Sequence, residues 1–234
     1  MLTASDSPGA QTGPWHAGNA GGAVGLALAS IAYIAIWIAG LTVWSGATSL
    51  AMSPAGVVAL YGSAPVRASL SLIFSEGLAA VPLLILLVAI AVTVRRRGAV
   101  AASVVVLVTG IAAVAVSLIE CVLGLLLTLV AAPGHDAGAA AFFFEGLNRL
   151  DGVKMLLLAV CALAASVGPA WRVRALPAWL RVVGVALAVA IITSGIGYLF
   201  LIPSLGKAAY VSLPLLLLWV SGSGAVLAWR AARS

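Results

Sequence analysis

The chain has very little charge. Only 8% of its 234 residues are Asp, Glu, Lys or Arg, whereas soluble domains carry about 25%. Apolar residues make up 64% of the sequence, and the mean hydropathy is +1.23. A surface with so few charges cannot face water over most of its area. The composition therefore excludes a soluble globular domain and predicts an integral membrane protein.

Residues that bind metals or form disulfides are also scarce. The two cysteines, Cys121 and Cys161, both lie within apolar runs, and the two histidines, His16 and His135, are both expected in loops. The chain has no CxxC pair and no Cys/His cluster, so neither a disulfide framework nor a zinc site is indicated. No pair of histidines could hold a haem within the membrane. We therefore expect no metal and no cofactor.

Motifs for nucleotides and for soluble enzymes are missing too. The sequence contains no Walker loop, no GxSxG, no HExxH and no Rossmann glycine fingerprint, which argues against nucleotide-driven transport. The net charge of +6 comes from basic residues in short segments between apolar runs, where they orient helices and contact anionic lipid. Membrane lipid is thus the expected partner and nucleic acid is not, while the oligomeric state stays open.

Six apolar runs are long enough to cross the roughly 30 Å of a bilayer's hydrocarbon core. They predict an all-α bundle of about six transmembrane helices over residues 22–230, after a flexible cytoplasmic tail at 1–21. The runs are 22–44, 68–94, 99–132, 152–167 (extended backwards by 139–150), 179–202 and 208–229. The third run would measure about 51 Å as one helix, so it must tilt strongly or project from the membrane.

The arginines set the expected orientation. Eight basic residues fall on the side of the bundle that holds both chain ends, and four fall on the other side. The positive-inside rule then predicts that both ends face the cytoplasm. Ten of the twelve basic residues are Arg, and Ala, Gly and Val are abundant, which is typical of a GC-rich bacterial genome. We expect a multi-pass protein of a bacterial inner (plasma) membrane.

The acidic residues indicate where a polar site lies. Only six are present, and four of them lie within or at the ends of apolar runs. Those four are Glu76, Glu120, Glu145 and Asp151. A carboxylate at the centre of the bilayer costs about 2.5–3.5 kcal/mol, so it needs a partner or a function. Glu145 and Arg149, four residues apart, are expected to form an interfacial pair rather than part of the site.

The expected topology gathers six polar residues in the outer half of the bundle. This candidate ligand-binding set is Glu76, Glu120, Asp151, Lys154, Tyr198 and Tyr210. Glu120 lies on a helical stripe of small or polar residues spaced by three and four, so its side chain should face the bundle interior. Asp151 and Lys154 are three residues apart and can pair on one helix. Pro82 leaves the carbonyl group of Leu78 without a donor close to Glu76.

Several functions fit this set. The interpretation that we favour is a polar pocket that binds a small amphipathic or lipid-like molecule. One alternative is a membrane cyclase or isomerase of a prenyl or quinone-type substrate, because a desolvated carboxyl group favours its neutral form and can donate a proton; no diphosphate-binding acidic motif supports it. Another is a proton-coupled transporter, although no internal repeat is visible. The last is a structural or accessory subunit, in which Glu76 and Glu120 merely hold helices together.

Four short stretches carry a resemblance to known proteins. They are RLDGVKM at 149–155, LPAWLR at 176–181, SGIGY at 194–198 and SLPL at 212–215. In these stretches the chain resembles a family of uncharacterised bacterial six-helix integral membrane proteins, grouped as a domain of unknown function, over about residues 22–230. The resemblance implies the six-helix fold and no particular activity.

Overall fold

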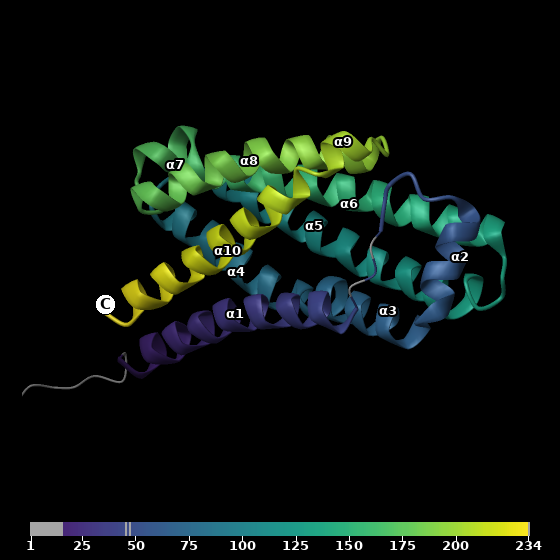
Figure 1. Cartoon of the computed structure of the whole chain (residues 1–234). Helices are drawn as coiled ribbons and strands as arrows, with labels where there is room; N and C mark the ends of the chain where they lie inside the picture. The colour runs from purple at the N-terminus through teal and green to yellow at the C-terminus, as the bar shows by residue number, and fades with distance from the viewer. Residues whose placement is uncertain (1–15, 45, 47, 234) are drawn as a thin grey trace, which may run out of the picture.

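The computed structural model describes residues 16–44, 46 and 48–233, and every regular element in that part of the chain is a helix (Figure 1). Six helical segments are long and apolar enough to cross a membrane. They are Gly21–Val43, Pro65–Arg96, Val100–Ala131, Ala137–Arg172, Ala178–Leu199 and Pro203–Ala231. The predicted all-α bundle of six spans is confirmed, and the protein is a multi-pass membrane protein. The first 15 residues of the predicted tail lie outside the described residues.

The described part of the chain contains ten α-helices and two short π-helices, of which α2 lies outside the spans. In order they are α1 (His16–Val43), α2 (Pro54–Ser63), α3 (Pro65–Leu72), η1 (Ile73–Leu78), α4 (Ala80–Arg96), α5 (Val100–Leu126), η2 (Leu127–Ala131), α6 (Ala137–Ser166), α7 (Gly168–Arg172), α8 (Ala178–Leu199), α9 (Pro203–Gly206) and α10 (Ala209–Ala231). Caps explain two of the starts: the side chains of Ser53 and Asp136 accept hydrogen bonds from the N–H groups of Gly56 and Ala139.

The six spans form a closed ring in the order of the chain. α1 packs against α4 and α10, and the remaining neighbours are α4 with α5, α5 with α6, α6 with α8, and α8 with α10. Short turns join several neighbours; Gly98, at φ 93°, lies in the turn between α4 and α5. The beginning of α1 and the end of α10 lie at the same end of the bundle (Figure 1), as six spans require.

The second, third and fourth spans are longer than the bilayer core. The 32 residues of Pro65–Arg96 would measure about 48 Å as an ideal helix, against about 30 Å of hydrocarbon. The parts of these spans farthest from the chain ends extend beyond α8, and α2 lies across that end of the bundle (Figure 1). The long apolar run at 99–132 thus forms one continuous helix, α5 with η2, rather than two spans.

Two separate apolar cores result from this shape. The larger core fills the part of the bundle nearer the two chain ends and includes Leu86, Ile90 and Trp219. The smaller core lies under α2, where the ring of Tyr61 contacts those of Trp44 and Phe144 at centroid distances of 5.0 and 6.2 Å. Tyr61 lies outside the spans, and burial raises the pKa of its hydroxyl.

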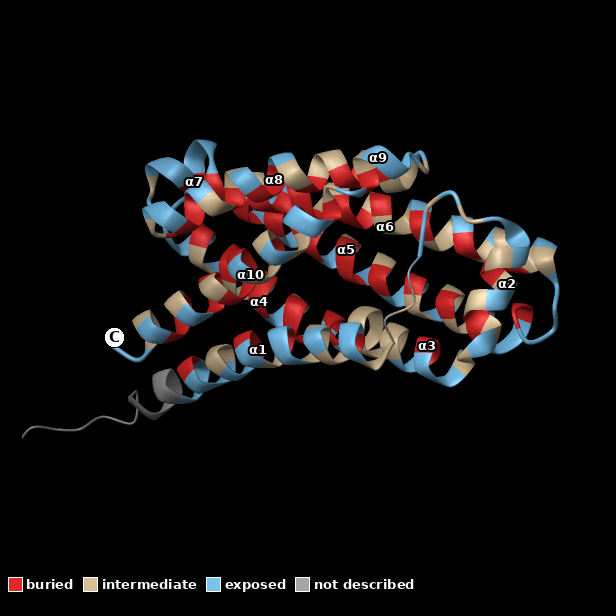
Figure 2. Ribbon diagram, in the orientation of Figure 1, coloured by how far each residue is buried: buried red, intermediate tan, exposed pale blue. Residues whose placement is uncertain are grey.

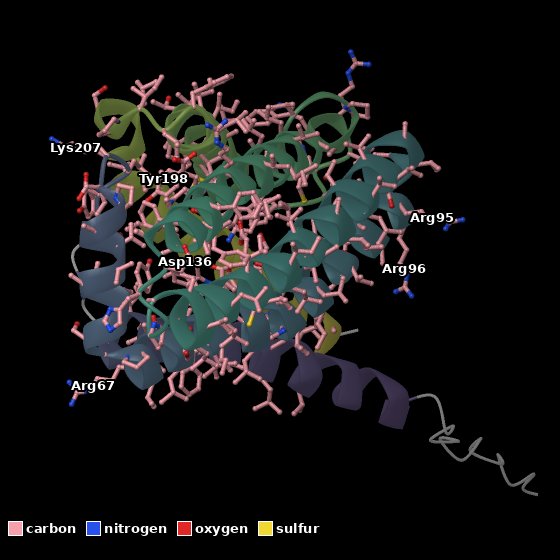
Figure 3. The ribbon with its side chains drawn as sticks, turned by 90° about the vertical axis from the view of Figure 1, so that its right-hand side faces the viewer. Arg67, Arg95, Arg96, Asp136, Tyr198 and Lys207 are labelled. Atoms are coloured by element: carbon pink, nitrogen blue, oxygen red, sulfur yellow. The ribbon has the colours of Figure 1, made fainter. Side chains whose placement is uncertain are left out.

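Burial follows the ring. Buried residues line the inside of the bundle, and exposed ones face outwards (Figure 2). Many of the outward residues are large and apolar, Val108, Val122 and Val189 among them, as a lipid-facing surface requires. The basic side chains of Arg67, Arg95, Arg96 and Lys207 point away from the ribbon at its edges (Figure 3). The few buried charges, Glu120 and Lys154 among them, lie in the interior of the bundle.

Candidate functional site

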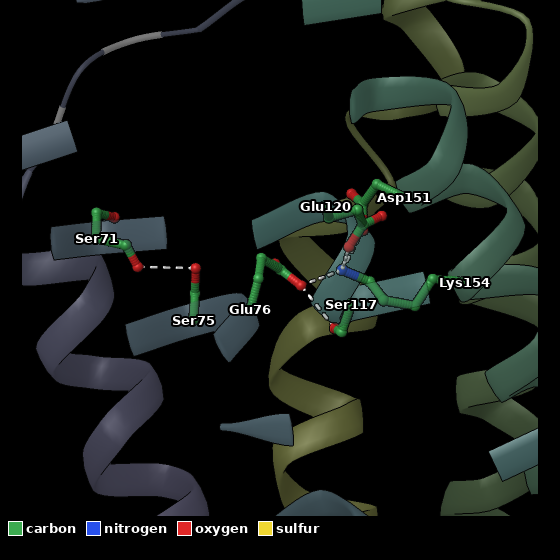
Figure 4. A network of polar contacts seen from close by, with 7 residues as sticks. All are labelled: Ser71, Ser75, Glu76, Ser117, Glu120, Asp151 and Lys154. Atoms are coloured by element: carbon green, nitrogen blue, oxygen red, sulfur yellow. Dashed lines mark hydrogen bonds and ion pairs between the residues drawn. The ribbon is translucent and has the colours of Figure 1, made fainter. Parts of the chain in front are cut away.

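Three carboxylates from three neighbouring helical segments meet at one ammonium group (Figure 4). Lys154 Nζ lies 2.6 Å from Glu76 Oε2, 2.5 Å from Glu120 Oε2 and 2.8 Å from Asp151 Oδ1. The hydroxyl of Ser117 donates a hydrogen bond of 2.7 Å to Glu76 Oε2. We call these five residues the Lys154 cluster. An ammonium group has three N–H bonds, so Lys154 can donate one hydrogen bond to each of the three carboxylates.

Helical spacing explains how two of the three elements present their groups. On α6, Asp151 and Lys154 are three residues apart and therefore share a face. On α5, Ser117 and Glu120 have the same spacing and are both buried. α6 packs against α5 along its length, so both pairs point into the same place. Glu120 faces the interior of the bundle, as its position on the stripe of small and polar residues predicts.

The third element, η1, is a π-helix. The N–H of Ala79 donates to the carbonyl of Phe74, five residues earlier, with an N···O distance of 3.0 Å. Pro82 follows closely and has no N–H for the carbonyl of Leu78, which weakens the ordinary α-helical pattern here. π-helical turns of this kind occur often at functional sites. The wider turn carries Glu76 towards Ser117 and Lys154.

Hydrogen bonds also tie η1 to the first span. Ser75 donates to the carbonyl of Ser71 at 2.9 Å, and Ser71 donates to the carbonyl of Gly40 on α1 at 2.7 Å. A Cβ at Gly40 would lie 3.2 Å from that backbone, so the glycine permits the close approach. The position of Glu76 is therefore supported from α1 as well as from α5 and α6.

The Lys154 cluster lies between the two apolar cores. Along η1 and its neighbours, Glu76 falls between Ala68 of the smaller core and Ala80 of the larger one. Along α6, Lys154 falls between Phe144 of the smaller core and Leu158 of the larger. Glu120 occupies the equivalent place on α5. The cluster is thus a polar layer between two apolar regions.

Charge is unbalanced in this layer. With every group ionised, three carboxylates and one ammonium sum to −2, and the side chains of Lys154 and Glu120 are only 9% and 1% exposed. An uncompensated charge at such a site costs several kcal/mol. Two further positive charges, as protons or as a bound cation, would neutralise the cluster. Glu120 Oε1 is fully buried and has no hydrogen-bond partner among the described residues.

Two small cavities border the cluster. The larger, of about 70 Å³, is lined by Trp37, Glu76, Asp151, Lys154, Met155, Leu158, Ile191, Tyr198, Leu213 and Leu216. The smaller, of about 20 Å³, is lined by Tyr33, Trp37, Ser75, Glu76, Ala79, Ala80, Leu83, Ser117, Lys154, Leu158 and Leu216. A single water molecule needs about 10–15 Å³ on this scale, so the smaller cavity has room for one water and the larger for several.

The structure brings together most of the candidate ligand-binding set. Glu76, Glu120, Asp151 and Lys154 are in direct contact, and Tyr198 lines the larger cavity beside them. Tyr210 does not join them: it is 83% exposed at the start of α10 and lines neither cavity.

Glu145 and Arg149 form the expected pair away from the cluster, at 3.9 Å and more than half exposed.

Sequence reasoning missed the contribution of the first span. Tyr33 and Trp37 of α1 line the cavities, yet an aromatic residue in an apolar run gives no sign of the face on which it lies. Ser117 is different, because it belongs to the small and polar stripe that carries Glu120. Its spacing of three from Glu120 is the signal that could have placed it in the site.

Comparison of the chain with protein-family models, with curated protein sequences and with solved structures found no match. The resemblance to bacterial six-helix membrane proteins therefore stays a prediction, and the chemistry of the site is argued from its geometry.

Proposed function

We propose that this multi-pass membrane protein is a proton-coupled carrier of a small solute, and that the Lys154 cluster is its proton-binding site. The observation that supports this most is the sharing of one ammonium by three buried carboxylates. Protons are the simplest source of the missing positive charge. A solute that brings charge into the cluster changes the number of protons held there, so solute and proton binding are linked and each affects the other equally.

The arrangement also offers a route from protonation to movement. Glu76, Glu120 and Asp151 come from the second, third and fourth spans, and Lys154 holds all three. A proton that neutralises one carboxylate weakens its attraction to the ammonium. The π-helix that carries Glu76 lacks the ordinary hydrogen-bond pattern, and such turns are sites where helices bend. Protonation would therefore loosen η1 from α5 and α6 first.

The size of the cavities favours a small solute. About 70 Å³ is well below the roughly 300–1,000 Å³ of pockets for drug-sized ligands. An amphipathic or lipid-like molecule, and equally the substrate of a prenyl or quinone cyclase, would need the outer helices to part. The charge asymmetry of the loops supports an inner (plasma) membrane location with the cluster nearer the outer face.

A structural or accessory role is the second candidate, and one observation favours it. Each N–H of Lys154 has a carboxylate partner, so the cluster can act as a clamp on three helices. A clamp and a proton-binding site differ in one measurable way. Only the proton-binding site exchanges protons when a solute binds.

Proton movement in proteoliposomes tests the proposal. The protein is reconstituted in vesicles that contain a pH-sensitive dye, and guanidinium, urea or methanesulfonate is added outside. These probes are a cation, a neutral molecule and an anion that do not carry protons across lipid themselves. We expect at least one of them to change the internal pH with the wild type and with Glu145→Gln, an exposed control, and to do so at least tenfold more slowly with Glu120→Gln. No change beyond that of empty vesicles with any probe would refute the carrier and favour the clamp.

A further inference from the structure

The larger cavity has two kinds of polar wall. Glu76 and Asp151 line it with carboxylates, and Trp37 and Tyr198 line it with aromatic rings. Lys154 lines it too, with its ammonium held by the carboxylates, and the rest of the lining is apolar, with Leu213 and Leu216 of α10 among it. Carboxylates attract a positive charge directly, and the faces of Trp and Tyr attract cations through the ring quadrupole. The two carboxylates and the two aromatic rings therefore favour a cation, and they outnumber the single ammonium of Lys154.

We propose that this cavity, here called the cation pocket, binds a small organic cation with N–H donors, of the guanidinium or short alkylammonium type. The proposal rests on the carrier function above and names the class of its solute. The volume of about 70 Å³ admits a few non-hydrogen atoms. Asp151, whose side chain is 21% exposed, is the carboxylate through which the cation first makes contact.

The state of the Lys154 cluster selects a cation over other solutes. Lys154 uses its three N–H groups within the cluster, so the ammonium has no donor left for an anion. The cluster thus needs further positive charge and further hydrogen-bond donors, since those of Lys154 are already in use. A cation with N–H groups supplies both, and its arrival releases protons that filled these roles before.

Helix packing places the pocket at the outer end of α8. Tyr198 is one residue before the end of that helix. A Cβ at Gly152 would lie 2.5 Å from the backbone nitrogen of Leu199 and 2.7 Å from the carbonyl oxygen of Gly195. This glycine therefore lets α6 and α8 touch, and it sets Asp151 beside Tyr198. A ligand entering from the outer side meets these two residues before it reaches Lys154.

Matched probes test the charge and donor requirements without any mutation. Full-length protein in detergent is mixed with guanidinium, with urea, its neutral isostere, or with tetramethylammonium, a cation without donors; sodium chloride controls for ionic strength. Thermal unfolding reports binding, and a pH-indicator dye in weak buffer reports proton release. We expect stabilisation and proton release with guanidinium at a Kd of about 0.1–10 mM, and neither with urea. Equal effects of urea and guanidinium, or no effect of guanidinium, would overturn the cation pocket.

Variants then locate the site. Tyr198→Leu removes the ring and should weaken guanidinium binding by about 5- to 30-fold, whereas Tyr198→Phe keeps the ring and should bind within about twofold of wild type. Tyr210→Leu, at an exposed tyrosine of the same end, is the matched control and should leave affinity unchanged. Unchanged affinity in a folded Tyr198→Leu, or an equal loss in Tyr210→Leu, would contradict the location.

The two proposals can fail separately. Guanidinium that binds beside Tyr198 but moves no protons into proteoliposomes keeps the cation pocket and refutes the carrier. Proton movement driven by methanesulfonate or urea, with no binding of guanidinium, keeps the carrier and refutes the cation pocket.

Discussion

Replacement of Lys154 by methionine gives the most direct test of the cluster. The change keeps most of the side-chain volume and removes the ammonium group from three carboxylates at 2.5–2.8 Å. Interhelical hydrogen bonds in membranes contribute about 0.6–1.7 kcal/mol each, so the two that join Lys154 to Glu76 and Glu120 give about 1–3 kcal/mol. The loss of one partner of a buried ion pair costs about 3–5 kcal/mol. We therefore expect Lys154→Met to lower the free energy of unfolding by about 3–5 kcal/mol.

An unfolding titration with SDS, followed by circular dichroism, measures this value. The double variant Lys154→Met/Glu120→Gln supplies the control, because it also removes the most buried of the carboxylate charges. The two changes should be non-additive, and the double variant should be more stable than Lys154→Met alone. A loss below about 1 kcal/mol for Lys154→Met, or strictly additive losses in the double variant, would contradict the arrangement in Figure 4.

Two further predictions concern packing and orientation. Gly152→Val places side-chain atoms against the backbone of α8 and should destabilise the protein by about 1–3 kcal/mol. Gly146→Ala on the same helix meets nothing within 4 Å and should be nearly neutral. Equal effects in the SDS titration would show that α6 and α8 do not touch at Gly152. For orientation, Lys207→Cys should react with a membrane-impermeant maleimide on intact cells and Arg97→Cys only after lysis, in a background free of the native cysteines; the reverse pattern would invert the topology.

Depth in the membrane can be predicted from the sequence, and direction around a helix cannot. The apolar runs give the number of residues from each end, so the sequence alone places Glu76, Glu120, Asp151 and Lys154 at one level. A charged side chain within the membrane also needs a partner, so these four side chains are expected to face the interior of the bundle. Tyr198 and Tyr210 share that level, but a tyrosine is tolerated on either face, and Tyr210 faces outwards.

The place of Trp37 in the site and the π-helix at Glu76 could not be predicted from the sequence. Trp37 contributes to both cavities, yet its span is apolar on all sides, so nothing in its pattern separates the buried face from the lipid face. The packing of all six spans together decides which helix lies against the face of α1 that carries Trp37. Pro82 does indicate a carbonyl group without a donor near Glu76. Whether the helix then kinks or forms a π-turn depends on the hydrogen bonds that Ser71 and Ser75 donate.

The ring of spans in chain order has a consequence for how the protein is made. Each span packs against the one synthesised just before it, and the contacts of α10 with α1 and α4 join the last span to the first two. Sequential contacts form quickly because they close short loops, and chains fold from the N-terminus as they emerge. The carboxylates and Lys154 are therefore already in place when the fourth span inserts. The cation pocket acquires its Leu213 and Leu216 wall last, when α10 closes the ring.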